Sequence, residues 1–114
     1  PMPQYARATL LAGLGNSLTA HDGLREFTFT LHDIRRITAA YGRQHYDMTR
    51  CLEIVQRRGI DLFLPENDPC FALFLTGAKQ NLLGLTPEPD WTAWIGENLK
   101  ATITIWKRKL FSWS

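Results

Sequence analysis

The sequence holds few cysteines and no long hydrophobic run. Its two cysteines, Cys51 and Cys70, lie far apart, which excludes the disulfide framework of a small secreted protein and the paired cysteines of a zinc knuckle. No apolar stretch reaches the roughly 18 to 20 residues that span a bilayer, and the first residues do not form a basic segment followed by an apolar signal core. We therefore expect a cytoplasmic protein with no integral membrane segment.

A strong excess of either charge is also missing. The 114 residues carry 13 Lys and Arg against 11 Asp and Glu, which gives a formal net charge of +2. Proteins held mainly by phosphate contacts are usually more basic. With 45% hydrophobic residues, the composition is that of an ordinary globular protein. The length suits a single domain over residues 1–114.

Apolar residues recur at helical spacing along most of the chain. Ile34, Ile37 and Tyr41 lie three and four residues apart, and similar stripes occur elsewhere. The pattern predicts a mainly α fold, a small helical bundle of about five helices, with a short strand-like segment at 27–30 as an option. The predicted helices cover residues 5–14, 30–41, 47–59, 68–84 and 91–113.

The last two predicted helices have the clearest boundary signals. Asp68 followed by Pro69 is a strong helix start, since the carboxylate can accept from a first-turn amide and proline at the first position loses no hydrogen bond. Gly84 is a natural end to that helix. Residues 86–90 then form a proline-rich linker before an amphipathic C-terminal helix, although Thr102–Ile105 within it also has β propensity.

Catalytic and metal-binding patterns are missing. Cys70 near a helix start would have a lowered pKa and could act as a nucleophile, but no histidine stands near it in sequence. The histidines His21, His32 and His45 lie in three separate segments, without the spacing that places ligands on one metal. We expect no enzymatic activity, no metal and no cofactor.

One alternative function is a DNA-binding regulator. The predicted helices 34–41 and 47–58, with a break at Gly42, have the outline of a helix-turn-helix motif. Polar side chains suited to reading bases or binding phosphates would lie on or next to the second helix. These candidates are Gln44, His45, Thr49, Arg50, Arg57 and Arg58.

The C-terminal segment is the more unusual feature. It combines tryptophan, which is enriched at binding hot spots, with the basic run Lys107–Lys109. We expect at least two of Trp91, Trp94 and Trp106 to fill the core, and a protein partner or a second copy to cover the rest of the segment. The candidate interaction residues are Trp106, Lys107, Arg108, Leu110, Phe111 and Trp113.

Part of the chain resembles a known group of proteins. Glu53–Ile54, Arg57–Ile60 and Leu62, followed by Asn67–Pro69 and an apolar segment ending near Leu82, are similar to the N-terminal part of conjugal-transfer accessory proteins of bacterial plasmids, of the transfer-activator type. Those proteins share a helix, a basic-Gly-Ile step, an acidic pair before proline and a second helix. The resemblance implies an accessory role in DNA transfer without catalysis. Our leading hypothesis is therefore a non-enzymatic adaptor.

Overall fold

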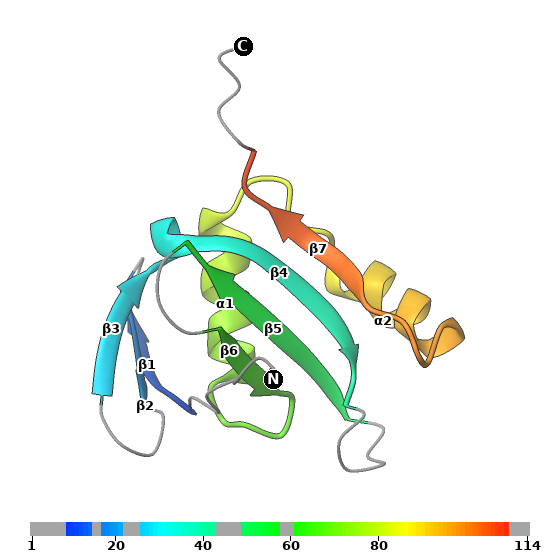
Figure 1. Cartoon of the computed structure of the whole chain (residues 1–114), viewed down its shortest axis with the longest axis horizontal. Coiled ribbons are helices and arrows are strands. Elements are labelled where there is room, and N and C mark those ends of the chain that lie inside the picture. The colour runs from blue at the N-terminus through cyan, green and yellow to red at the C-terminus, as the bar shows by residue number, and fades with distance from the viewer. Residues whose placement is uncertain (1–8, 15–16, 22–25, 43–48, 58–60, 110–114) are drawn as a thin grey trace, which may run out of the picture.

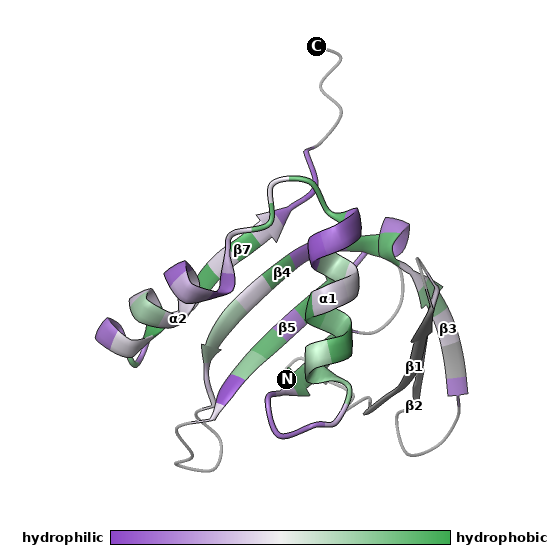
Figure 2. Cartoon of the chain, turned by 180° about the vertical axis from the view of Figure 1, so that it is seen from behind, coloured by the Kyte–Doolittle hydropathy of each residue, from purple (hydrophilic) through white to green (hydrophobic). Residues whose placement is uncertain are grey.

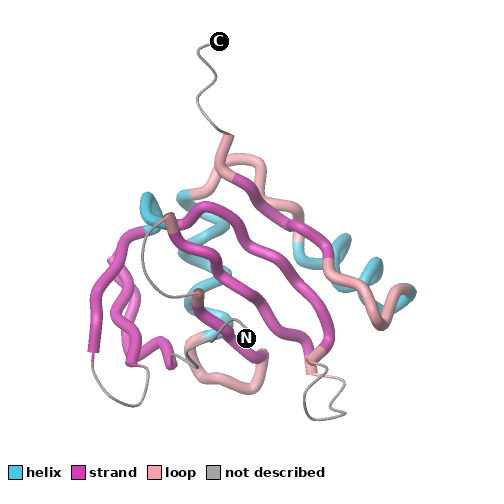
Figure 3. The backbone as a smooth tube through the Cα atoms, viewed as in Figure 1, coloured by secondary structure: helices cyan, strands magenta, loops and turns pink. Residues whose placement is uncertain are grey.

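The computed structural model describes residues 9–14, 17–21, 26–42, 49–57 and 61–109. Seven strands and two α-helices run through this part of the chain (Figures 1 and 3). The strands are β1 (Thr9–Leu14), β2 (Ser17–His21), β3 (Glu26–Thr30), β4 (Ile34–Tyr41), β5 (Arg50–Gln56), β6 (Leu62–Pro65) and β7 (Ile103–Lys107). The helices are α1 (Phe71–Asn81) and α2 (Glu88–Glu97), with one 3-10 turn, η1 (Leu31–Asp33). The predicted mainly α bundle of five helices is therefore wrong.

Two of the predicted helices are neighbouring antiparallel strands. Residues 34–41 form β4, and β5 takes up most of the predicted helix at 47–59. The residues buried in β4 include Ile37 and Ala39, which alternate as a strand requires. β-Branched residues such as Ile37 and Ile54 also favour a pleated strand. Ile34 and Ile37 are three residues apart and both buried because the pairing of β4 with β5 shifts register between Ile34 and Arg36, so this spacing resembles a helix without one being present.

The predicted C-terminal helix divides into a helix and a strand. α2 ends at Glu97, and β7 begins at Ile103, where the β propensity of Thr102–Ile105 prevails. Glu88 and Pro89, which we placed in a linker, form the first turn of α2. Trp91 and Trp106 are both buried, as expected, although Trp106 reaches the core from a strand.

The boundaries of α1 follow the sequence more closely. The Asp68 carboxylate accepts a hydrogen bond of 2.8 Å from the Cys70 N–H, and α1 begins at the next residue. After α1, Gly84 has a φ of +88°, a conformation that side chains with a Cβ rarely adopt. α1 therefore lies within the predicted helix 68–84, which was too long at both ends, since α1 covers only Phe71–Asn81.

A capping box lies at the start of η1, just before β4, although no α-helix follows it. The Asp33 carboxylate accepts from the Thr30 N–H at 2.8 Å and from the Thr30 hydroxyl at 3.1 Å. The backbone hydrogen bond lowers the pKa of Asp33, against a smaller opposing effect of desolvation. Only η1 forms before the chain enters β4, so this local signal positions a turn between β3 and β4.

The strands form two antiparallel sheets with orders β1-β2-β3 and β6-β5-β4-β7. In the second sheet, Leu52 pairs with Ala39 and Leu64, and Ile54 pairs with Ile37 and Leu62. These six side chains are at most 1% exposed, so a continuous apolar stripe crosses three strands.

Both helices cover one face of the four-stranded sheet, and the three-stranded sheet stands beside α1 (Figures 1 and 2). Phe74 of α1 and Trp91 of α2 pack in the same core as the stripe, and Leu18 and Phe29 join it from the smaller sheet. Neither α1 nor α2 has the length and apolar composition needed to cross a membrane, and no other described segment forms an α-helix.

Candidate functional site

The residues predicted to read DNA do not form a helix-turn-helix motif. Both helices on which the prediction depended are strands, so that prediction is wrong. The Thr49 carbonyl accepts from the Gly42 N–H and the Cys51 thiol, and the Arg57 side chain is exposed. Gln44, His45 and Arg58 lie outside the described residues.

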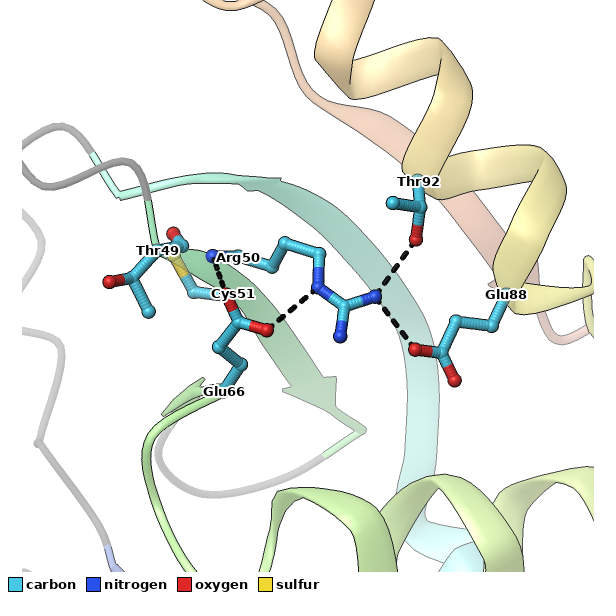
Figure 4. A network of polar contacts seen from close by, with 6 residues as sticks. All are labelled: Thr49, Arg50, Cys51, Glu66, Glu88 and Thr92. Carbon is cyan, nitrogen blue, oxygen red and sulfur yellow. Dashed lines mark hydrogen bonds and ion pairs between the residues drawn. The ribbon is translucent and has the colours of Figure 1, made fainter.

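Arg50 instead forms a network that joins three parts of the fold (Figure 4). From the first position of β5, its guanidinium donates from Nε to Glu66 at 2.9 Å and from Nη1 to Glu88 at 2.7 Å and to the Thr92 hydroxyl at 2.9 Å. Its backbone N–H also donates to Glu66 at 3.1 Å. Glu66 follows β6, and Glu88 and Thr92 belong to α2. We call these four residues the Arg50 network.

Aromatic rings and acids together stabilise the charge of Arg50. The guanidinium carbon lies 5.6 Å from the centre of the Phe71 ring and 5.3 Å from that of Trp91, within the range of cation–π attraction. Desolvation alone would lower the pKa of Arg50, but the hydrogen bonds to Glu88 and Glu66 raise it above its ordinary value. A cleft of about 620 Å³ borders this network. With its cation already satisfied, the network has the properties of a structural cross-link.

A second hollow lies at the end of β7, and we call it the β7 groove. Its volume is about 580 Å³. It lies between the turn that follows α1 and the last residues described in the chain, which Figure 1 shows side by side. The groove is lined by Leu31, His32, Asn81, Leu82, Leu83, Gly84, Trp106, Lys107, Arg108 and Lys109.

The turn after α1 is fastened to β7 from both sides of Gly84. The indole Nε1–H of Trp106 donates to the Leu83 carbonyl at 3.1 Å, and the Thr86 N–H donates to the Ile105 carbonyl at 2.9 Å. The side chain of Leu83 itself is 98% exposed. The apolar turn at the end of β7 is also visible in Figure 2. Leu83 is therefore a fully exposed leucine on a well-anchored turn.

Arg108 closes the groove on the other side. Its guanidinium donates to the carbonyls of Ile34 and Leu31, both at 3.0 Å, and lies 5.1 Å from the Trp106 ring centre. Desolvation lowers the pKa of Arg108, and the positive charge of Arg57 lowers it further, against a weaker effect of Asp33. Within the described part of the chain Arg108 forms no ion pair, and two backbone carbonyls hold its guanidinium in place.

Three of the six predicted interaction residues line the β7 groove. Trp106 is 8% exposed and builds the groove from the core side, Arg108 is half-buried, and Lys107 is exposed. Leu110, Phe111 and Trp113 lie outside the described residues. Leu83 was missed because it was assigned to a helix that extended to Gly84. The glycine directly after it was the available signal that Leu83 belongs to a turn.

Among the residues that the structure describes, the other candidates for chemistry do not assemble into a site. Desolvation raises the pKa of the Cys70 thiol, and the negative charge of Asp68 adds to this, which is the reverse of what a nucleophilic cysteine requires. Within the described ranges, no three His, Cys, Asp or Glu side chains are grouped so that they could hold a metal ion.

The sequence segments that resemble conjugal-transfer proteins occupy different kinds of structure. Glu53 and Ile54 lie in β5, whereas Asn67–Pro69 precede α1, so only the second segment occupies the predicted kind of structure. Comparisons of the chain with protein-family models, with curated proteins and with solved structures give no match.

Proposed function

We propose that this chain is a non-enzymatic accessory protein that acts through protein–protein contact, with the β7 groove as its contact surface. The observation that carries the proposal is the 98% exposure of Leu83 on a turn that two hydrogen bonds tie to β7. The backbone of an anchored turn loses little conformational freedom when a partner covers its side chain. More of the free energy of apolar burial then remains for binding.

The other residues of the groove fit the composition of an interface. Trp106 and Arg108 belong to the residue types enriched at binding hot spots, and they hold the turn and the end of β7 together. Lys107 and Lys109 are exposed at its border, where charged residues steer association and select partners. As for the setting, we propose the cytoplasm and, from the sequence resemblance, a conjugative or other mobile-element process.

Site-specific photo-crosslinking in the producing cells tests this proposal. A photoreactive amino acid replaces Leu83 in one variant and Leu73 in a control variant. Leu73 is 58% exposed but lines neither the β7 groove nor the cleft beside Arg50. We expect a discrete protein adduct from position 83 and none from position 73. An adduct of two copies of this chain would equally support contact through the groove, whereas equal labelling from both positions would contradict the proposal.

A further inference from the structure

We infer that the β7 groove binds a short acidic segment of a partner protein, in which at least two carboxylates flank one large apolar side chain. This inference rests on the proposed function and specifies the chemistry of the partner. It follows from the charge, the apolar surface and the size of the groove.

The described residues that line the groove carry charge of one sign. Lys107, Arg108 and Lys109 are among them, and none of the other described lining residues carries a carboxylate. Arg57 adds positive potential, since it lowers the pKa of Arg108 by more than Asp33 raises it. Carboxylates of a partner would therefore enter a region where cations are concentrated and, among the described residues, not paired with acids.

The apolar surface lies directly beside these cations. Leu83 is the most exposed large hydrophobic residue in the described part of the chain, and its turn forms the opposite border of the groove. A purely acidic segment would leave this leucine in water. A segment that also carries a leucine, isoleucine or phenylalanine would bury it while its carboxylates meet Lys107 and Lys109.

The volume of the groove suits a short segment. About 580 Å³ lies within the range of sites that take a drug-sized molecule, which corresponds to a few side chains.

Nucleic acid fits the same surface less well. Single strands bind on exposed aromatic side chains, but Trp106, the aromatic residue among the described residues that line the groove, is 8% exposed. Exposed Leu83 also offers nothing to a phosphate. We therefore assign the groove to a polypeptide.

Fluorescence anisotropy with labelled synthetic peptides tests the assignment on the full chain. The probe alternates glutamate with leucine. One reference peptide has lysine for each glutamate, a second has serine for each leucine, and a DNA duplex is the third reference. We expect the Glu–Leu peptide to bind more tightly than all three references, and its affinity to fall as salt is added. Equal or tighter binding of either reference peptide, or of the duplex, would overturn the inference.

Charge-reversal variants locate the binding. Lys107→Glu together with Lys109→Glu should weaken binding of the Glu–Leu peptide by roughly tenfold or more. The control is Lys100→Glu, an exposed lysine before the other end of β7, which should change the affinity by less than about twofold. Leu83→Ser should weaken the Glu–Leu peptide but not the Glu–Ser peptide. All these side chains are exposed, and thermal unfolding checks that each variant is folded.

The proposed contact surface and the inference of an acidic partner segment can be contradicted independently of each other. A crosslinked partner at position 83 without binding of the Glu–Leu peptide would overturn the acidic segment and leave the contact surface intact. Peptide binding that Lys107→Glu with Lys109→Glu does not weaken would also overturn the inference, since the peptide would then bind elsewhere.

Discussion

Two arginines of this protein lie close to tryptophan rings and differ in what they bind. Arg50 pairs with the carboxylates of Glu66 and Glu88, whereas Arg108 donates to two backbone carbonyls. Their pKa values accordingly shift in opposite directions. Desolvation lowers the pKa of both arginines. At Arg50 the hydrogen bonds to Glu88 and Glu66 outweigh this effect, whereas at Arg108 the positive charge of Arg57 lowers the pKa further. Both guanidinium groups remain charged at neutral pH.

The comparison separates a charge that stabilises the fold from a charge that is presented to a partner. The carboxylates of the Arg50 network come from segments distant in sequence, so that a single guanidinium fastens α2 and the end of β6 to β5. Arg108 fixes the end of β7 but leaves its positive charge for the β7 groove. The following predictions test this distinction, beginning with the largest expected change.

Arg50→Met should lower the free energy of unfolding by about 2–3 kcal/mol. The substitution keeps most of the apolar stem but leaves Glu66 and Glu88 without their shared cation, and breaking a partly buried ion pair is costly for that reason. Urea unfolding measures the change. Arg35→Met, at an exposed position of β4, is the control and should stay within about 0.5 kcal/mol of the original protein.

Arg108→Met should cost less, about 1 kcal/mol in the same urea measurement. The substitution removes the hydrogen-bond donor of the Leu31 and Ile34 carbonyls, but it leaves no carboxylate without its ion-pair partner. If Arg108→Met destabilises the protein as much as Arg50→Met does, the two arginines have the same structural role, and the distinction between them fails.

The pH dependence of stability should change more with Arg50 than with Arg108. Desolvation would raise the pKa of Glu66, but the hydrogen bonds from the Arg50 backbone and side chain hold it below its ordinary value. Since the folded pKa is below the unfolded one, this stabilisation is present above the unfolded pKa and is lost as the pH falls through the folded pKa.

Unfolding in urea at several acidic pH values measures this dependence. Arg50→Met should make the dependence on pH weaker in part, because the backbone donor remains. Arg108→Met should change it much less, because Arg108 interacts with an acid, Asp33, only weakly. A flattening of the same size in both variants would contradict the assignment to Glu66.

Leu83→Ser should have the smallest effect on stability, within about 0.5 kcal/mol, because the side chain makes almost no contact that folding creates. In contrast, it should weaken the partner contact. Leu73→Ser is the matched control, with a similarly small effect on unfolding and no effect on the contact. A large destabilisation by Leu83→Ser would show that the turn depends on this side chain.

Local signals predicted the boundaries of α1 better than any other part of the fold. The Asp68 carboxylate and Gly84 act through backbone groups within a few residues, so the sequence around them contains the whole interaction. Thr30 and Asp33 likewise form a local cap, but whether an α-helix follows it depends on strand partners. β4 pairs with β5 and with β7, and the β7 partner is about seventy residues away in sequence, beyond the reach of periodicity.

The candidate site was predictable in its residue types and not in its geometry. Trp106, Lys107 and Arg108 were selected because tryptophan next to basic residues is typical of interfaces. The position of Leu83 beside them follows from the end of α1 and from the bond between Trp106 and the turn, which no spacing in the sequence indicates. Arg50 was assigned to DNA for its charge, because its two acids lie 16 and 38 residues further along the chain.

The most direct test of the central claim is amide hydrogen exchange of the chain alone and in complex with the partner captured through position 83. Binding in the β7 groove should slow exchange at residues 82–86 and 106–109. It should leave residues 66–72 and 88–92, around the Arg50 network, unchanged. Slowed exchange around the Arg50 network with unchanged exchange at residues 82–86 would contradict the account and move the contact surface to the cleft beside Arg50.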